Sequence, residues 1–83
     1  MAQPQAQEDR IRLYTGDYCS YCRRVKKELD RLNLGYEEVH ADADGREEVM
    51  KLSGQRAIPI LTIGDEVLID STHIIRELRN RFA

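Results

Sequence analysis

Apolar and polar positions along the chain follow two different periods, and the changes between them predict the secondary structure. The clearest helical pattern runs from Ser20 to Asn33, where apolar residues recur every three to four positions: Cys22, Val25, Leu29 and Leu32. This spacing places the apolar side chains on one face of a helix. We expect Gly35 to close that helix, because glycine is the residue most often found just after a helix end.

Alternating or continuous apolar stretches bounded by turn residues predict four strands. They are expected at 10–14, 36–40, 58–63 and 66–69. Gly64-Asp65 has the composition of a two-residue hairpin turn between the last two strands.

Two further helices are predicted from their capping residues. Asp44 is a good N-cap, and Glu47 completes a pair resembling a capping box before a short helix that ends at Gly54. Ser71 is expected to cap a last helix that continues to the end of the chain.

The predicted order of elements is therefore β-α-β-α-β-β-α, which indicates an α/β fold. The first two strands are joined through a helix and should be parallel by the right-handed crossover rule, whereas the last two form an antiparallel hairpin. We expect a central mixed four-stranded sheet with three helices packed on its faces. Residues 10–83 are assigned to one domain, and residues 1–9 to a disordered N-terminal tail.

Composition and charge narrow the class of protein. The 83 residues carry a formal net charge of −2, with 41% hydrophobic and 34% charged residues, as is ordinary for a soluble globular protein. No apolar run approaches the roughly 18 residues that a membrane span needs. The only basic cluster, Arg23-Arg24 with Lys26-Lys27, is interpreted as a solvated helix face, so no nucleic-acid partner is expected. With two cysteines and no apolar signal-peptide core, the chain is expected in the reducing cytoplasm.

Both cysteines lie in the stretch TGDYCSYC, at the predicted start of the first helix. A C-x-x-C pair that follows the first strand of a βαβ unit suits thiol–disulfide exchange. The attacking group must be a thiolate, so its pKa must fall below the free value of about 8.5. Cys19 lies where unpaired N–H groups and the helix dipole favour an anion, whereas Cys22 lies one turn further on the apolar face. We therefore expect Cys19 to attack a disulfide and Cys22 to resolve the mixed disulfide.

Three other interpretations of the two cysteines stay open. A structural zinc ion needs four ligands, and only His40 and His73 are available to complete the set, so no metal is assigned. A permanent disulfide between Cys19 and Cys22 would close a very small loop and stabilise the fold little. If both cysteines were core residues without a chemical role, both should lie at apolar positions of the helical pattern. Cys19 lies outside that pattern.

Three motifs together give the chain a resemblance to a known family. They are YTGDYCSYC after the first strand, RAIP at the start of the third strand, and IDSTHI at the start of the last helix. Over residues 10–82 the chain resembles a glutaredoxin. The resemblance implies the thioredoxin-like (glutaredoxin) fold, in agreement with the order of elements above. It also implies a glutathione-dependent thiol–disulfide oxidoreductase that reduces protein disulfides and glutathione mixed disulfides.

The resemblance also implies a glutathione site. Tyr21 would line the glutathione groove, and Pro59 would be the family's cis-proline. The backbone of Ile58 would pair with glutathione like an added strand. Arg56 would pair with the glycyl carboxylate, and Ser71-Thr72 would receive the γ-glutamyl carboxylate at a helix N-terminus. Simpler roles remain for each residue type: exposed side chains, a proline that opens an edge strand, and a serine that only caps a helix.

Some positions depart from the family pattern. Gly16 stands where many members have a lysine, and Ile69-Asp70 replaces a Gly-Gly pair. Thr72-His73 replaces acidic residues, and DSTHI resembles the glutathione-binding turn of the glutathione transferase N-terminal domain. Ser20 replaces a rigid proline between the cysteines, which adds a backbone donor and loosens the loop. These changes bear on glutathione contacts more than on the exchange chemistry.

Two alternative functions follow from the same resemblance. Some members hold a [2Fe–2S] cluster between two subunits, with the first cysteine (here Cys19) and glutathione as ligands, and a looser loop at Ser20 favours this alternative. The chain would otherwise serve as an electron donor reduced by thioredoxin reductase instead of glutathione. The expected partners are glutathione and disulfide-containing or glutathionylated proteins, and we expect a monomer that binds neither membranes nor nucleic acids.

Overall fold

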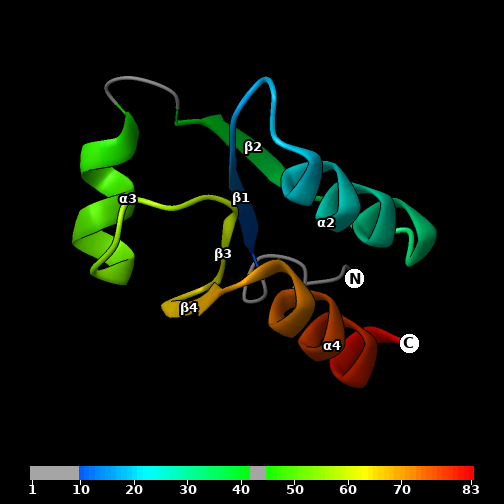
Figure 1. Ribbon diagram of the computed structural model, residues 1–83. Coiled ribbons are helices and arrows are strands. Elements are labelled where there is room, and N and C mark those ends of the chain that lie inside the picture. Colours follow the sequence, from blue (N-terminus) through cyan, green and yellow to red (C-terminus); the bar gives the residue numbers. More distant parts are fainter. Residues whose placement is uncertain (1–9, 42–44) are drawn as a thin grey trace.

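The computed structural model describes residues 10–41 and 45–83, and it confirms the predicted order of elements (Figure 1). The predicted tail 1–9 and the predicted cap Asp44 lie outside the described residues. The elements are β1 (Ile11–Thr15), α2 (Ser20–Arg31), β2 (Glu37–His40), α3 (Gly45–Ser53), β3 (Ile60–Ile63), β4 (Glu66–Ile69) and α4 (Ser71–Phe82).

The four strands form one mixed sheet in the order β2-β1-β3-β4. Strand β1 pairs with β2 in parallel, as the crossover rule predicts, and with β3 in antiparallel. Strands β3 and β4 form the predicted antiparallel hairpin. Figure 1 shows α2 and α4 side by side over one face of the sheet and α3 on the opposite face.

The alternation of side chains along β1 and β3 divides the core into two parts. Leu13 pairs with Leu61, and the neighbouring pair Tyr14 and Ile60 points to the opposite face. The larger cluster lies under the two adjacent helices, where it includes Val25, Leu29, Ile74 and Leu78. The smaller cluster contains Tyr14, Ile60 and Val49 of α3. The sheet is therefore covered on both faces, which matches an α/β architecture.

The end of α2 differs from the sequence prediction. The helix ends at Arg31, and Asn33, with φ of 60°, takes the closing position that we assigned to Gly35. The N–H of Leu34 donates to the carbonyl of Leu29 at 3.0 Å, as in a Schellman motif. Gly35 was the wrong choice because asparagine also tolerates the left-handed region and occurs earlier in the chain.

The start of α4 also differs from the prediction. Asp70, not Ser71, is the N-cap, and its carboxylate accepts the backbone N–H of His73 at 3.4 Å. Ser71 is the first helical residue, and its hydroxyl accepts a hydrogen bond from the Nη1 of Arg24 at 3.5 Å. Strand β3 begins at Ile60 and not at residue 58, since Pro59 has no N–H to offer to a strand ladder.

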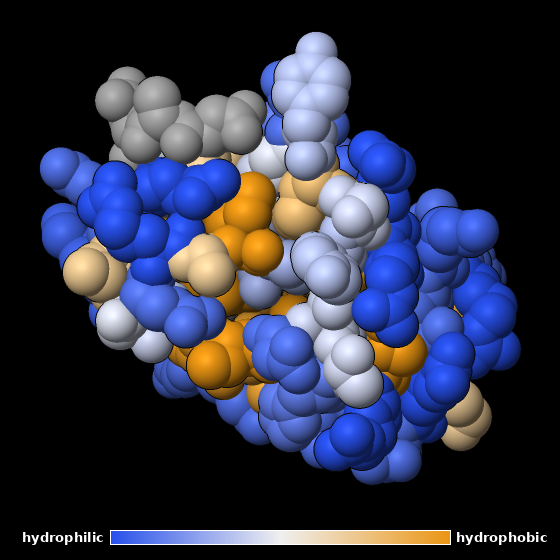
Figure 2. All heavy atoms as spheres, viewed as in Figure 1, coloured by the Kyte–Doolittle hydropathy of each residue, from blue (hydrophilic) through white to orange (hydrophobic). Residues whose placement is uncertain are grey.

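Hydrophilic side chains cover most of the helices, while apolar atoms reach the surface between α3 and α4 (Figure 2). Exposed hydrophobic residues include Tyr21, which is 59% exposed, and Ile69 at the end of β4. Within residues 10–41 and 45–83, none of the helices has the length and apolarity that crossing a bilayer requires.

Candidate active site

The two cysteines lie at the N-terminus of α2, in two different environments. Cys19 is the N-cap, with extended backbone angles and a half-buried side chain. Cys22 is fully buried, one turn further along the helix. Both are free thiols, and the backbone N–H of Cys22 donates to the Sγ of Cys19 at 3.1 Å. The accessible sulfur is therefore the one that accepts the helix-end hydrogen bond.

The electrostatics of the pair separate the two sulfurs further. Burial is the main cause that raises the pKa of the Cys22 thiol above its ordinary value, and a hydrogen bond with Cys19 adds to it. Hydrogen bonds from Thr15 and Gly16 act in the opposite direction without cancelling the effect. At Cys19, the positive end of the helix dipole and a donated N–H stabilise negative charge on sulfur. The first turn of α2 contains no acidic residue that would oppose this.

Cys19 lines a hollow of about 440 Å³. The lining of this hollow comes from three parts of the chain: the loop before α2 with the first turn of that helix, the start of α3, and the segment before β3. The lining residues are Gly16, Tyr18, Cys19, Ser20, Tyr21, Arg46 and Ile58. A disulfide sulfur can therefore approach Cys19 from solvent without any movement of Cys22.

A second hollow of about 380 Å³ adjoins the first, since Tyr21 and Ile58 line both. It brings together five of the residues that the sequence assigned to glutathione: Tyr21, Ile58, Pro59, Ser71 and Thr72. The Ile58–Pro59 peptide bond is cis. Ser71 and Thr72, the first two residues of α4, line this hollow, and a helix N-terminus suits a bound carboxylate.

The structure does not place Arg56 with the other predicted residues. Its side chain is exposed and lines neither hollow, while its backbone carbonyl accepts a hydrogen bond from the Nη1 of Arg46 at 3.0 Å. Arg46 is the arginine that lines the same hollow as Cys19, and it was not predicted from the sequence. Gln55 and Asp70 also line the second hollow without having been predicted. Only Asp70 had a sequence signal, because it replaces a family glycine at the helix start.

The zinc alternative finds no cluster of ligands in the structure. Within the described ranges, no group of three or more His, Cys, Asp or Glu residues is arranged to hold a metal ion. His40 lies 3.5 Å from the carboxylate of Asp17, a contact that is an ion pair only when the imidazole is protonated. His73 lies in the first turn of α4, and its backbone N–H is used by the cap.

Comparisons with known proteins converge on one kind of domain. Residues 13–83 match the family model described as "Glutathione S-transferase, N-terminal domain". A curated relative, the glutaredoxin of Neisseria meningitidis serogroup A, is 36% identical over 58 residues, which cover 66% of this chain and 68% of the relative. Glutaredoxin 3 of Escherichia coli K12 is 32% identical over 66 residues, covering 77% of this chain and 72% of the relative.

Solved structures give the same picture of the fold. Glutathione transferase E6 from Drosophila melanogaster superimposes with a TM-score of 0.81 at 32% identity. The match covers 89% of this chain and 36% of that protein, so the chain spans about a third of the transferase.

Proposed function

Because the chain belongs to the glutaredoxin family, and is therefore a thiol–disulfide oxidoreductase of thioredoxin-like fold, we propose that glutathione is its reductant. In this proposal it reduces glutathione mixed disulfides and protein disulfides. The observation that carries the proposal is the placement of Cys19 at the cap of α2, beside a hollow that continues to the N-terminus of α4.

With a glutathionylated protein, the Cys19 thiolate attacks the glutathione sulfur. A bond forms between Cys19 and glutathione, and the protein leaves as a thiolate. A second glutathione thiolate then attacks the glutathione sulfur of this mixed disulfide. It releases oxidised glutathione and restores the Cys19 thiolate. Each turnover therefore consumes one free glutathione, and the other half of the oxidised glutathione comes from the substrate.

With a protein disulfide, the first attack leaves one substrate cysteine bonded to Cys19. Cys22 then attacks the Cys19 sulfur, releases the substrate as a dithiol and forms the Cys19–Cys22 disulfide, which two glutathione molecules reduce. The raised pKa of Cys22 suits this order, because a thiol that stays protonated does not compete for the first attack.

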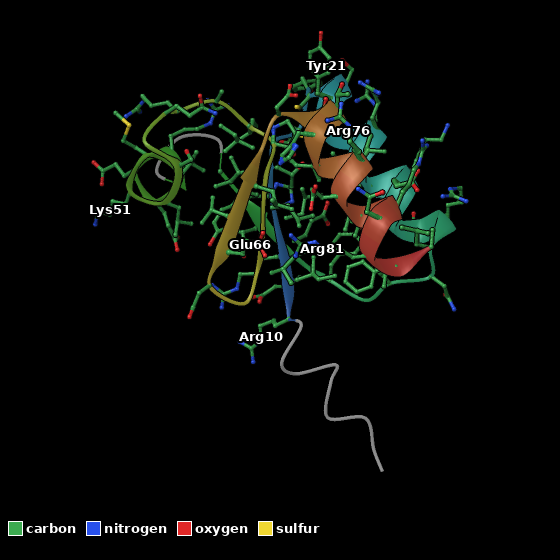
Figure 3. The ribbon with its side chains drawn as sticks, turned by 90° about the horizontal axis from the view of Figure 1, so that it is seen from below. Arg10, Tyr21, Lys51, Glu66, Arg76 and Arg81 are labelled. Carbon is green, nitrogen blue, oxygen red and sulfur yellow. The ribbon has the colours of Figure 1, made fainter. Side chains whose placement is uncertain are left out.

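We infer that the second hollow receives the γ-glutamyl end of glutathione. The N-terminus of α4 at Ser71 and Thr72 offers N–H donors to its carboxylate. Asp70 lines the same hollow, and its carboxylate suits the neighbouring ammonium group. The ring of Tyr21 is exposed between the two hollows and points away from the body of the protein, free to cover a bound peptide (Figure 3).

A coupled assay with glutathione, glutathione reductase, NADPH and a low-molecular-weight mixed disulfide tests this function. Cys19→Ser should reduce the rate to that measured without protein, while Cys22→Ser, the matched cysteine-to-serine control, should keep much of the activity. Full activity of the Cys19→Ser protein would refute the assignment.

Replacing glutathione and its reductase by thioredoxin reductase tests the alternative electron donor. If turnover is faster with thioredoxin reductase, that enzyme and not glutathione is the electron donor. The proposed roles of the two cysteines would be unchanged. The [2Fe–2S] alternative stays a prediction from the sequence, since within the described residues no observation beyond the position of Cys19 bears on it.

A further inference from the structure

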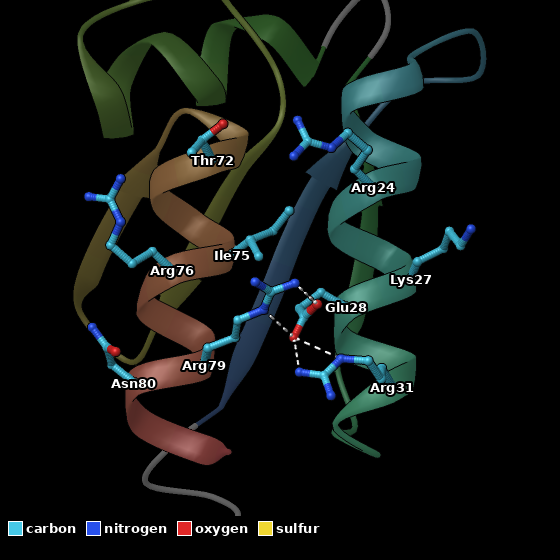
Figure 4. A pocket seen from close by; sticks show the side chains of 9 residues that line it. All are labelled: Arg24, Lys27, Glu28, Arg31, Thr72, Ile75, Arg76, Arg79 and Asn80. Atoms are coloured by element: carbon cyan, nitrogen blue, oxygen red, sulfur yellow. Dashed lines mark hydrogen bonds and ion pairs between the residues drawn. The ribbon is translucent and has the colours of Figure 1, made fainter.

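A third and larger hollow, of about 670 Å³, lies between α2 and α4 (Figure 4). Its walls carry five cationic side chains and one carboxylate: Arg24, Lys27, Arg31, Arg76, Arg79 and Glu28. We call this hollow the basic groove. It gathers five of the 13 Lys and Arg residues of a chain whose net charge is −2. The groove is therefore a cationic surface on a chain whose net charge is negative.

The helical spacing explains why these residues line the same groove. Positions 24, 27, 28 and 31 lie on one side of α2, and positions 76 and 79 lie on one side of α4. Figure 4 shows Arg24 and Arg31 of α2 and Arg79 of α4 projecting into the space between the two helices, where Glu28 lies. Lys27 and Arg76 project from the outer sides of α2 and α4 and line the edges of the groove. The buried Ile75 also lines the groove. The basic groove is thus formed by tertiary packing of two amphipathic helices.

The one carboxylate in the basic groove, that of Glu28, already pairs with two of the arginines. Glu28 is buried and accepts hydrogen bonds from Arg31 and Arg79, at distances from 2.6 to 3.2 Å. Arg24, Lys27 and Arg76 are exposed, and none of the three forms an ion pair with another residue in 10–41 or 45–83. Three cations therefore remain available to an incoming anion.

The basic groove adjoins the second hollow, in which we propose that glutathione binds. Thr72 lines both, and the guanidinium of Arg24 contacts the hydroxyl of Ser71, which lines the second hollow. The N-termini of α2 and α4 lie at the same end (Figure 4), so the groove leads away from Cys19 along both helices. From Arg24 to Arg31 it extends about 10 Å, the length of three extended residues.

We propose that the basic groove binds an acidic segment of the protein whose disulfide or mixed disulfide is reduced at Cys19. This proposal rests on the proposed function, because it takes the substrate to be a polypeptide. Four of the five cations are arginines, whose planar forks fit carboxylates. None of the lining residues, all of them described, is aromatic, so the groove offers no surface on which nucleic-acid bases would stack.

The geometry also predicts where the acidic residues of the substrate lie relative to its reacting cysteine. Arg24 is five and Arg31 twelve helical positions from Cys19, or about 7 and 18 Å along α2. At about 3.3 Å per extended residue, the substrate carboxylates should occur roughly two to six positions from the reacting cysteine. The groove therefore selects substrates by sequence context and leaves the sulfur chemistry unchanged.

Two glutathionylated peptides test this preference. One carries Asp or Glu at the positions that flank the cysteine by two to six residues, and the other carries Asn or Gln there. In addition, a fluorescent copy of the acidic peptide with serine in place of cysteine reports binding without reaction. The protein variant is Lys27→Glu with Arg76→Glu, since neither residue lines the two hollows near Cys19.

The matched control is Arg10→Glu with Lys51→Glu. Both residues are exposed, both lie outside the basic groove, and the control has the same net charge as the groove variant. Figure 3 shows Arg10 at the start of β1 and Lys51 on α3, away from Arg76 on α4. A general effect of net charge would therefore appear in both variants.

We expect the ratio of kcat/KM for the acidic over the neutral peptide to fall about tenfold in the groove variant and to stay near the starting value in the control. Anisotropy of the serine peptide should show the same pattern and weaken with added salt. An unchanged ratio in the groove variant, absence of binding, or tighter binding of a single-stranded oligonucleotide would overturn the proposal. Turnover of the low-molecular-weight mixed disulfide reports the proposed function separately, so the two failures are distinguishable.

Discussion

Replacement of Glu28 by glutamine should destabilise the protein through loss of one buried negative charge. The side chain of Glu28 is 6% exposed, and it lies between Arg31 of its own helix and Arg79 of α4 (Figure 4). The carboxylate therefore joins the two helices that form the walls of the basic groove. Glutamine keeps the shape of the side chain, but its amide carries no negative charge and accepts hydrogen bonds through one oxygen only, so it pairs less well with two guanidinium groups.

The magnitude follows from the pKa of Glu28. Hydrogen bonds from Arg31, and then from Arg79, lower this pKa from 4.5 to about 2. A shift of this size corresponds to about 3 kcal/mol if it is taken at face value. Both arginine side chains are 58% exposed, so water screens the interaction. We therefore expect Glu28→Gln to lose about 1–2 kcal/mol of unfolding free energy at pH 7, or a fall in Tm of about 5–10 °C.

The pH dependence distinguishes a charge effect from a packing effect. Because the folded-state pKa is depressed, the contribution of Glu28 is complete above about pH 5 and is lost as pH falls toward 2. More than half of the difference between wild type and Glu28→Gln should be gone by about pH 3. Urea unfolding followed by circular dichroism at pH 7 and at pH 3 measures this difference.

Glu37→Gln is the matched control. Glu37 pairs with Arg12 at 3.0 Å, but its side chain is 56% exposed, so we expect its loss to cost less than about 0.5 kcal/mol. A Glu28→Gln difference of equal size at pH 7 and pH 3 would refute the electrostatic explanation. A loss of unfolding free energy at pH 7 no larger than that of Glu37→Gln would refute a stabilising role for the pairing of Glu28 with Arg31 and Arg79.

Two further predictions concern the thiols and the start of α4. Iodoacetamide should label Cys19 first, because Cys22 is fully buried and its pKa is raised; peptide mass spectrometry that found Cys22 labelled at the same rate would contradict this. Asp70→Ala should cost about 1–2 kcal/mol in thermal unfolding, since it removes the N-cap and leaves an alanine at φ of 72°. Asp70→Gly should cost only a few tenths, and an equal loss for both variants would show that φ plays no part.

The sequence predicted the features that depend on local periodicity. The positions of Leu13, Val25 and Leu29 on buried faces follow from periods of two and of three to four residues, and each lies in the core. The C-x-x-C spacing likewise placed Cys19 at a helix start, because one turn of helix is a local property. The parallel pairing of β1 with β2 and the antiparallel pairing of β3 with β4 followed from the connections between the elements, whereas the position of β3 beside β1 was not predicted.

Features that depend on competition between neighbouring residues, or on long-range packing, were not predicted. Asn33 and Asp70 were passed over in favour of Gly35 and Ser71, although asparagine tolerates the left-handed region and aspartate caps a helix as well as serine does. Arg46 resembles any other arginine of a helix in the sequence, and only the packing of α3 against the sheet places it in the lining of the hollow that contains Cys19. Arg56 was assigned by family position, and its exposed side chain lines neither hollow.

The shared direction of α2 and α4 connects the chemistry with the basic groove. Both helices direct their positive ends toward one edge of the molecule, where Cys19 and the second hollow lie, so negative charge on sulfur and on a bound carboxylate is stabilised at the same place. The same alignment brings cationic side chains of the two helices near one another, and a buried anion offsets part of their repulsion. Glu28 supplies that anion to two of the five cations and leaves the rest for a ligand. The contacts of Glu28 with Arg31 and Arg79 therefore reduce the repulsion between cations in a groove that leads to the site where the Cys19 thiolate is proposed to react.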